Sequence, residues 1–472
     1  MVITPNIIIK KMDLRYMCCL ICAISFQFLY AQYNTNDAWH DAQIMKYADK
    51  SKIAKERVQW FREAKIGMFI HWNPSSVVAA EISWSKQFYE DTGENLKHNP
   101  RPTINDCPAQ EHTDWIRWFK PAVSKEVYDN LHKSFYPGMF NADSIVSTAK
   151  RAGIKYIVMV TKHHDGFCMW DTSYTDYNIM NTPFKRDIVG EMATACHRHD
   201  IKFCIYYSQR DWHHPNYSAE ELPLYNLFMR NQIKELITKY APVSGIFFDA
   251  HDWNKAPDIW EPEKMFKEIY EIAPNIIINN RCGVPADYNT PEQRIGKIDM
   301  ETSWESCMTF TGEWSWRGFD NEVIPFEKCM DYLIGCAGGN GNLLLNIDPL
   351  PTGQIDPREK QRLEQMGQWL EKNGEAIYGT LGGPFLPSEW GTSTRRGNMM
   401  YLLVKDMRKM PNFIPPMPCE IKSIYVDDKK ISFKKDKNGI VLNIPSWMFH
   451  EYITVVKIKT DKDLSDIPLM TM

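Results

Sequence analysis

The stretch that decides the fold is Tyr156–Phe167, which reads YIVMVTKHHDGF. Its first six residues, Tyr156–Thr161, are apolar or favour β-structure and predict a buried strand. The turn that follows, Lys162–Phe167, places two adjacent histidines and an aspartate where that strand ends. Buried histidine is costly unless it is hydrogen-bonded or chemically used. Catalytic groups gather at the carboxyl ends of strands in an α/β barrel, so this turn is the first candidate for a functional site.

Short β-like runs alternate with amphipathic helical patterns from about residue 57 onward. This alternation implies a parallel sheet, and over ~320 residues it predicts a (β/α)8-like TIM barrel. A doubly wound sheet is the alternative, but no glycine-rich phosphate loop supports it. The predicted strands are 66–71, 156–162, 202–207, 245–249, 276–280 and 342–346, and the predicted helices are 142–152, 189–199, 222–240, 262–273 and 356–373.

The sequence pattern changes beyond Gly379, where short β-like runs are separated by turns. This spacing predicts a small C-terminal antiparallel β-sandwich. We therefore predict a catalytic barrel over 32–383 and a sandwich over 384–472, which either packs against the barrel or binds sugar. The predicted sandwich strands are 399–407, 419–426, 429–435, 439–444 and 452–459. A long insertion, 77–141, is expected to lie over the barrel mouth.

Residues 1–31 have the pattern of a secretory signal peptide. Basic residues precede an apolar run, Met17–Tyr30, which ends just before Gln32. The run is too short to cross a bilayer comfortably, so no membrane anchor is predicted. We expect an exported protein, either periplasmic or secreted.

Composition excludes several classes of partner. The 55 basic and 59 acidic residues give a net charge of -4, which argues against a nucleic-acid surface. Three of the 12 cysteines lie in the predicted signal peptide, and the others show no CxxC spacing. The sequence therefore predicts no zinc motif, no cofactor and no clear disulfide framework. Oligomeric state is not indicated.

Several predicted strands end in polar or aromatic groups, which suits glycoside hydrolysis by two carboxylates. Asp249 is the best nucleophile candidate, because it follows an apolar strand directly and has basic neighbours that keep it ionised. The acid is Glu292, Glu301 or Glu305, and pattern reasoning does not choose among them.

Distinctive motifs recur in order along the chain, and they are Gly67–Trp72, Glu81–Ser85, Lys162–Phe167, Lys185–Asp187, Tyr206–Ser208, Phe248–Asp249, Trp304–Thr309 and Asn373–Gly379. Together they resemble the α-L-fucosidases of glycoside hydrolase family 29, along nearly the whole mature length.

The resemblance implies an exo-acting retaining hydrolase that removes terminal α-L-fucose from a fucosylated glycan through a covalent intermediate. Asp249 matches the family's nucleophile. Thr290–Gln293 resembles the segment that carries the acid/base, so Glu292 is the preferred acid/base residue. Glu305 and Glu301 are the reserve candidates for that role. The Trp304–Thr309 signature resembles the subfamily that prefers α-1,3/1,4 linkages. The implied sugar-holding residues are His71, Glu81, Trp84, His163, His164, Tyr206, Tyr207 and Arg281, with Trp316 at the wall or leaving-group side.

The chain departs from the family pattern at a few positions. Asn73 replaces a glycine usual after the His-Trp pair, Phe247 stands where a tryptophan is frequent, and Asp348 lies in an altered Asn-Val-Gly-Pro run. These departures leave the glycone open, with α-L-galactose as an alternative to fucose. Two other classes stay open: a non-catalytic protein that binds fucosyl glycans, and a metal-assisted barrel hydrolase, which would respond to a chelator.

Overall fold

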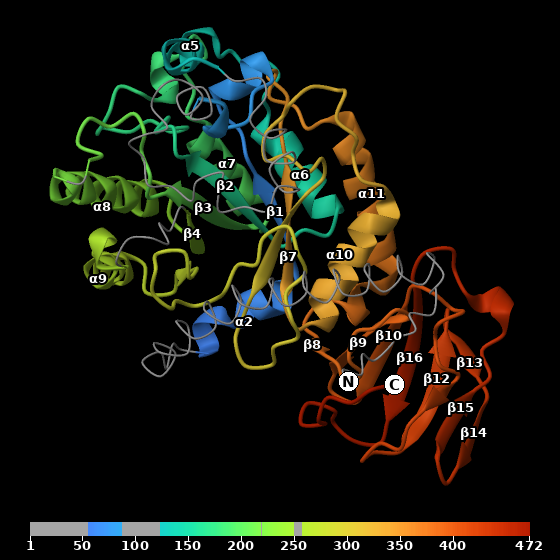
Figure 1. Cartoon of the computed structure of the whole chain (residues 1–472). Helices are drawn as coiled ribbons and strands as arrows, with labels where there is room; N and C mark the ends of the chain where they lie inside the picture. The colour runs from blue at the N-terminus through green and yellow to red at the C-terminus, as the bar shows by residue number, and fades with distance from the viewer. Residues whose placement is uncertain (1–54, 87–122, 219, 250–256) are drawn as a thin grey trace, which may run out of the picture. The chain divides into compact units, whose positions relative to one another are not determined.

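The structure of the chain is a computed structural model that describes residues 55–86, 123–218, 220–249 and 257–472. The predicted signal peptide and much of the predicted insertion lie outside these ranges. Within them, a parallel sheet precedes two antiparallel sheets (Figure 1). The prediction of a TIM-like barrel followed by antiparallel β-structure is confirmed.

The parallel sheet has the strand order β5-β4-β3-β2-β1-β7-β6 among the described residues. Sequential strands are neighbours except for β5 and β6, which lie at the two ends of this order, and β7 lies beside β1, as expected when a sheet curls toward closure. The strands are β1 (Ile66–Ile70), β2 (Tyr156–Lys162), β3 (Lys202–Ser208), β4 (Gly245–Asp249), β5 (Ile277–Ile278), β6 (Glu305–Thr309) and β7 (Asn342–Ile347). Strand β6 was not predicted, and β5 is shorter than predicted.

A closing segment, residues 287–293, lies between β5 and β6. Asn279 bridges Tyr288 in parallel on one side, and Glu292 bridges Cys307 in parallel on the other. Backbone hydrogen bonds accompany both bridges. This irregular segment therefore takes the place of an eighth strand and completes the ring.

Most helices follow strands and cover the outside of the parallel sheet, whereas the first helix, Lys55–Ala64, precedes β1 and packs Phe61 against residues inside the barrel (Figure 1). Polar side chains start several of them: Asn141, Asp187 and Asp356 each accept a backbone N–H of the first turn. The helices are α2 (Lys55–Ala64), α5 (Lys125–Asn130), α6 (Ala142–Arg151), α7 (Ile188–Arg198), α8 (Leu222–Lys239), α9 (Pro262–Ile272), α10 (Phe326–Gly338) and α11 (Pro357–Asn373).

Strand side chains alternate between two apolar clusters, because successive residues of a strand point to opposite faces. One cluster fills the barrel interior and includes Phe69, Val158, Tyr206, Phe247 and Leu344. The other lies between strands and helices and includes Met68, Met159, Tyr207, Phe248 and Leu345.

The C-terminal part forms a six-stranded sheet, β13-β12-β16-β10-β9-β8, and a three-stranded sheet, β11-β15-β14. One apolar cluster joins residues of both sheets, as in a sandwich. The opposite face of the larger sheet, including Tyr401 and Leu403, joins the cluster of the barrel helices, which fits the packing role. The strands are β8 (Leu381–Gly382), β9 (Gly391–Arg396), β10 (Met399–Val404), β11 (Phe413–Ile414), β12 (Ile421–Val426), β13 (Lys429–Ile431), β14 (Phe433–Asp436), β15 (Gly439–Leu442) and β16 (Thr454–Thr460).

Two details differ from the predicted sandwich. The predicted strand 429–435 is two strands, β13 and β14, which belong to different sheets and meet at Ser432. Strand β8 already belongs to the six-stranded sheet just before residue 384, and the boundary itself stays a prediction. A search of the described helices for one long and apolar enough to span a membrane finds none.

A buried pair of carboxyl groups, Asp348 and Glu359, lies where β7 meets α11. They are 2% and 0% exposed, and the Asp348 backbone N–H donates to Glu359 Oε2 at 3.4 Å. Burial raises the pKa of Asp348 to about 7. Burial and the neighbouring Asp348 raise the pKa of Glu359 well above its usual range. The nearby Arg358 forms an ion pair with Asp356, with Nη2 2.8 Å from Oδ2. A bound proton, instead of this arginine, therefore reduces the negative charge of the Asp348–Glu359 pair.

We predict that Asp348→Asn raises the free energy of unfolding at pH 8 by about 1–3 kcal/mol. The folded chain keeps a proton on this pair up to about pH 7, whereas the unfolded chain releases it near pH 4. Wild-type stability should therefore fall as pH rises through this window, and the neutral amide removes part of that loss. Denaturant titrations at pH 5 and pH 8 measure the effect.

The control is Asp331→Asn, because Asp331 is 37% exposed and pairs with Lys405 at the surface. Exposed pairs contribute little, so this variant should follow the wild type at both pH values. An Asp348→Asn protein less stable than wild type at pH 8 would contradict the account.

Candidate active site

Three polar side chains from neighbouring strands meet at the C-terminal end of the barrel. Asp249 ends β4, Tyr206 lies in the adjacent β3, and Arg281 follows β5. The Tyr206 hydroxyl donates to Asp249 Oδ2 at 2.7 Å, and Arg281 Nη1 donates to Oδ1 at 2.8 Å. The His164 Nε2 atom lies 4.0 Å from Oδ2. Asp249 is thus oriented from two sides.

The surroundings of Asp249 favour its ionised form. Burial alone raises the pKa of this carboxyl, but the positive charge of Arg281, the proximity of His164 and the two hydrogen bonds outweigh it. The net pKa lies well below the usual range of aspartate. A permanently ionised carboxylate at a barrel mouth has the state that a nucleophile needs.

Glu292 is held by the same arginine. Arg281 Nη2 donates to Glu292 Oε2 at 2.7 Å, while Nη1 holds Asp249. The side chain of Glu292 is 39% exposed, so it reaches solvent at the edge of the site. Two carboxylates, one deep and one accessible, therefore share one guanidinium.

The two reserve carboxylates lie elsewhere. Glu305 begins β6 at the amino end of the strand, where it is fully buried and accepts the Tyr156 hydroxyl at 2.5 Å. Burial raises the pKa of Glu305 to about 8, so it is largely protonated. Glu301 is exposed and precedes that strand. The structure brings neither to Asp249, which leaves Glu292 as the partner carboxylate.

Three histidines lie beside Asp249, and we call this cluster of residues at the barrel mouth the pocket. The rings of His163 and His164 have centroids 4.0 Å apart, and His71 lies 5.7 Å from His163. Burial lowers the pKa of His71 to about 4 and of His164 to about 3, so the rings are neutral near pH 7. Each Nδ1 atom meets a different buried side chain. The pairs are His71–Asn346 at 2.7 Å, His163–Ser83 at 2.6 Å and His164–Ser208 at 2.6 Å.

An aromatic wall, Phe69, Phe247 and Trp314, packs against residues of this cluster. The ring centroid of Phe69 lies 5.1 Å from that of Phe247 and 6.1 Å from that of Trp314. The Trp314 centroid lies 4.8 Å from that of His71. The Arg281 guanidinium sits 5.2 Å from the Phe247 ring centre. Sequence reasoning singled out Phe247 but missed Phe69 and Trp314. For Phe69 the signal was present, because it stands two residues before His71 on the same face of β1.

Glu81 and Trp84 also lie near these residues, and each makes a specific contact. Glu81 is buried and accepts the backbone N–H of Trp314 at 3.1 Å, which fixes part of the wall. Trp84 packs edge-on against His164 with ring centroids 5.4 Å apart. Trp316 packs instead on the exposed Phe319, at 5.6 Å, farther along the same loop.

The prediction that Tyr207 holds the sugar is wrong. Its hydroxyl donates to Gln232 of α8 at 2.7 Å, and its ring belongs to the cluster between strands and helices. The reason is the two-residue period of β3, which turns Tyr206 inward and Tyr207 outward.

The other residues of the turn after β2 hold loops together. Lys162 is fully buried, and its Nζ lies 3.1 Å from Asp211 Oδ2. Asp165 accepts the Tyr128 hydroxyl at 2.7 Å and the Asn73 amide at 2.5 Å. Asn73, the residue that replaces a usual glycine, thus adds a hydrogen bond to this turn.

Among the residues that the structure describes, His163, His164 and Asp249 form a group that could hold a metal ion. Their ligand atoms lie within 4.8 Å of one another, and two imidazoles with one carboxylate suit zinc. However, the Arg281 guanidinium already contacts Asp249 at 2.8 Å. A cation placed there would meet a positive charge at close range, so the donor set fits a metal poorly.

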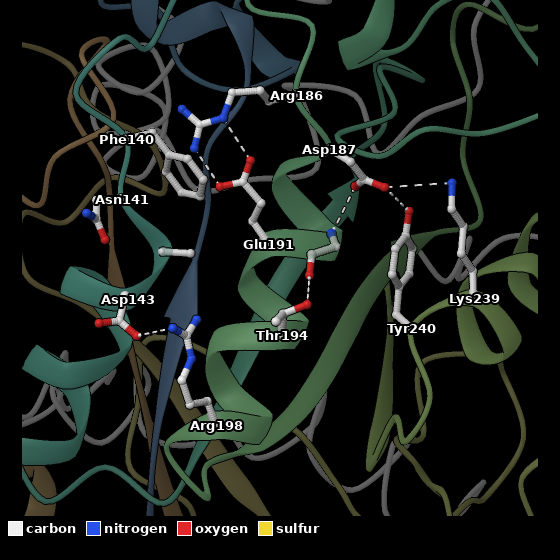
Figure 2. Close-up of a pocket in the computed structure, with 12 residues that line it drawn as sticks. Phe140, Asn141, Asp143, Arg186, Asp187, Glu191, Thr194, Arg198, Lys239 and Tyr240 are labelled. Carbon is white, nitrogen blue, oxygen red and sulfur yellow. Dashed lines mark hydrogen bonds and ion pairs between the residues drawn. The ribbon is translucent and has the colours of Figure 1, made fainter.

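A surface cavity of about 620 Å³ lies at α6 and α7, and none of the predicted site residues lines it (Figure 2). Its charged groups pair with one another: Arg186 with Glu191 at 2.6 Å, and Arg198 with Asp143 at 3.5 Å. The cavity therefore offers no carboxylate pair comparable to that at the barrel mouth.

Comparison with known proteins gives a consistent result. The family model described as Alpha-L-fucosidase matches residues 32–375. The human plasma alpha-L-fucosidase is 26% identical over 85% of this chain and 89% of its own. Alpha-L-fucosidase isoenzyme 1 from Paenibacillus thiaminolyticus has a TM-score of 0.75 and 27% identity, over 86% of this chain and 99% of its own. The Thermotoga maritima alpha-fucosidase, solved with a mechanism-based inhibitor, has a TM-score of 0.66 and 25% identity, over 85% of this chain and 96% of its own.

We predict that Tyr206→Phe raises the pKa of Asp249, because the carboxylate loses a hydrogen bond that favours its charged form. Tyr207→Phe is the matched control and should leave that pKa unchanged, since its hydroxyl faces α8. Titration of the Asp249 carboxyl carbon by NMR, with the signal assigned by Asp249→Asn, measures both. Equal shifts in the two variants would contradict the inward and outward assignment.

Proposed function

Because this chain belongs to the alpha-L-fucosidase family, and is thus a glycoside hydrolase, we propose that it is an exo-acting retaining enzyme that releases terminal α-L-fucose from glycans. The observation that carries the proposal is the shared guanidinium. Arg281 joins an ionised, half-buried Asp249 to a more accessible Glu292 at the mouth of the barrel. Retaining hydrolysis needs two close carboxyl groups with different tasks.

In the first step Asp249 attacks the anomeric carbon of the fucoside. The bond from that carbon to the leaving oxygen breaks, and protonated Glu292 gives its proton to this oxygen. The exposed position of Glu292 suits this task, because the leaving group lies on the open side of the pocket. The histidines, being neutral, orient the sugar hydroxyls without adding charge.

In the second step a water molecule attacks the anomeric carbon of the fucosyl ester. Glu292 accepts the water proton, and the bond to Asp249 breaks to restore the carboxylate. Arg281 matches this exchange, since it pairs with Asp249 while Glu292 is protonated and with Glu292 while Asp249 is esterified. One guanidinium thus balances one negative charge throughout.

The aromatic wall supports fucose over α-L-galactose. The C5-methyl of fucose is apolar and suits this wall, of which Trp314 is the half-buried member while Phe69 and Phe247 back it from the barrel interior. A hydroxymethyl there would bury a hydroxyl against aromatic carbon, which costs roughly 1–3 kcal/mol when no partner is offered. A preference for branched α-1,3/1,4 linkages rests on the resemblance of Trp304–Thr309, which contains the whole of β6 beside the closing segment.

Export by a signal peptide over 1–31, a catalytic barrel over 32–383 and a C-terminal sandwich over 384–472 complete the proposal. Catalysis by two carboxylates requires no metal or cofactor, so a chelator should leave the rate unchanged.

A binding protein without turnover is the second candidate. The wild-type form of such a protein would release no fucose. Its Asp249→Ala variant would keep the affinity for fucosylated glycans. The ionised state and oriented geometry of Asp249 favour the enzyme.

We predict that Asp249→Ala lowers fucose release from an aryl α-L-fucoside by about 10³-fold or more, because the nucleophile is gone. Glu292→Gln should slow the hydrolysis of a fucosylated trisaccharide more than that of an aryl fucoside. The aryl fucoside has a good leaving group, which needs less protonation by an acid. Added azide should restore part of the Asp249→Ala activity by attacking in place of the carboxylate. Fucose release and the anomeric product are followed by NMR.

Glu305→Gln is the control for the acid/base, because Glu305 lies at the opposite end of the barrel. It should keep the rates within a few-fold of wild type. Strong loss with Glu305→Gln and little with Glu292→Gln would reverse the assignment.

We predict that the wild type releases fucose from a branched α-1,3/1,4-fucosylated trisaccharide faster than from an aryl fucoside. An aryl α-L-galactoside should react roughly 10–100-fold more slowly than the fucoside, owing to the buried hydroxyl. Comparable rates for trisaccharide and aryl fucoside would remove the linkage preference and keep the enzyme class. Hydrolysis of the galactoside faster than that of the fucoside would make α-L-galactose, instead of fucose, the sugar that the enzyme releases.

A further inference from the structure

Two of the sugar-facing histidines, His71 and His163, are fixed in opposite tautomers by the buried side chains behind them. A neutral imidazole donates from one nitrogen and accepts at the other, and the partner of Nδ1 decides which. The partners differ in kind: an amide oxygen behind His71 and a hydroxyl behind His163.

Asn346 behind His71 is oriented by its second contact. Its Nδ2 donates to the Trp314 carbonyl oxygen at 2.9 Å, so its Oδ1 faces His71 Nδ1 at 2.7 Å. Turning the amide over would set two oxygens against each other at the Trp314 carbonyl. Since an amide oxygen only accepts, His71 carries its proton on Nδ1. The Nε2 atom of His71 is therefore a hydrogen-bond acceptor in the pocket.

Ser83 behind His163 has the opposite effect. Its Oγ accepts the Asp165 backbone N–H at 2.8 Å and lies 2.6 Å from His163 Nδ1. The side chain is fully buried, and among the described contacts Nδ1 is the acceptor within its reach. A buried hydroxyl that lacks an acceptor is costly, so Ser83 donates its proton to Nδ1. The Nε2 atom of His163 then carries a proton and is a donor.

Ser83 is held in place at a cost in backbone conformation. Its φ is 62°, in the left-handed region that disfavours residues other than glycine. Its N–H donates to the Tyr128 hydroxyl at 2.7 Å, and that hydroxyl donates to Asp165 Oδ2 at 2.7 Å. Strain of this kind persists where surrounding structure enforces it and clusters at functional sites. A serine at a position suited to glycine points to a use for its hydroxyl.

We propose that Asn346 and Ser83 are positioning residues that give the pocket an acceptor at His71 Nε2 and a donor at His163 Nε2. The inference rests on the proposed function and deepens it. A sugar hydroxyl both donates and accepts, so a fixed acceptor beside a fixed donor orients two hydroxyls in a defined sense. A sugar whose hydroxyls stand elsewhere leaves one of these buried groups unsatisfied, which disfavours it.

The test is ¹⁵N NMR of histidine rings in the full chain without substrate, since ring nitrogens that carry a proton resonate far from those that do not. His71→Gln and His163→Gln assign the signals. We expect a protonated Nδ1 in His71 and a protonated Nε2 in His163. In Ser83→Gly the His163 signals should move toward a mixture of tautomers while those of His71 stay. Asn346→Leu should do the reverse. The same tautomer in both wild-type rings would overturn the proposal.

Kinetics of an aryl α-L-fucoside separate positioning from a structural role. Ser83→Gly should lower kcat/KM roughly 10–100-fold. Its melting temperature should fall only slightly, because glycine suits the positive φ and offsets part of the loss of the Asp165 and His163 contacts. Ser208→Ala is the NMR control, and it should move only the signals of His164. An unchanged kcat/KM in Ser83→Gly would also overturn the proposal. Failure of the proposed function is distinguishable, because the wild type would then release no fucose whatever its tautomers.

Discussion

A parallel barrel lets only every second residue of a strand face its interior, and this restriction decides where chemistry can stand. Phe247 and Asp249 face inward together on β4, and Tyr206 does so on β3. On β7 the same period turns Asn346 toward His71, the residue that follows β1. The site is therefore a consequence of strand register at the C-terminal end of the barrel, and each inward residue rests on one that is two positions earlier.

Much of this arrangement could be predicted from the sequence, because the regular strands carry continuous apolar runs. The run before His163 and the run before Asp249 indicated both the strand and the end at which the chemistry lies. The outward orientation of Tyr207 could also have been deduced, since it shares its face with Phe203 and Ile205. The adjacent tyrosines match the family motif equally well, and the two-residue period of the strand separates them.

Other parts depend on contacts between distant segments and leave little local signal. The closing segment, residues 287–293, contains no apolar run, and its pairing is set by the strands on either side. Trp314 rather than Trp316 joins the pocket because Glu81 and Asn346 bind the backbone of Trp314. The change of sheet at Ser432 likewise leaves no break in the β-pattern of 429–435.

The irregular closing segment explains why Arg281 matters for both carboxylates. Arg281 Nε donates to Thr290 Oγ1 at 2.8 Å, and Nη2 donates to the Thr290 carbonyl oxygen at 3.2 Å. The same guanidinium therefore fixes the backbone that carries Glu292, the carboxylate of Glu292 and the carboxylate of Asp249. Lysine, with one compact ammonium, does not span these positions, whereas the planar fork of arginine does. The distance between the two carboxylates is thus set by one rigid group rather than by a regular strand.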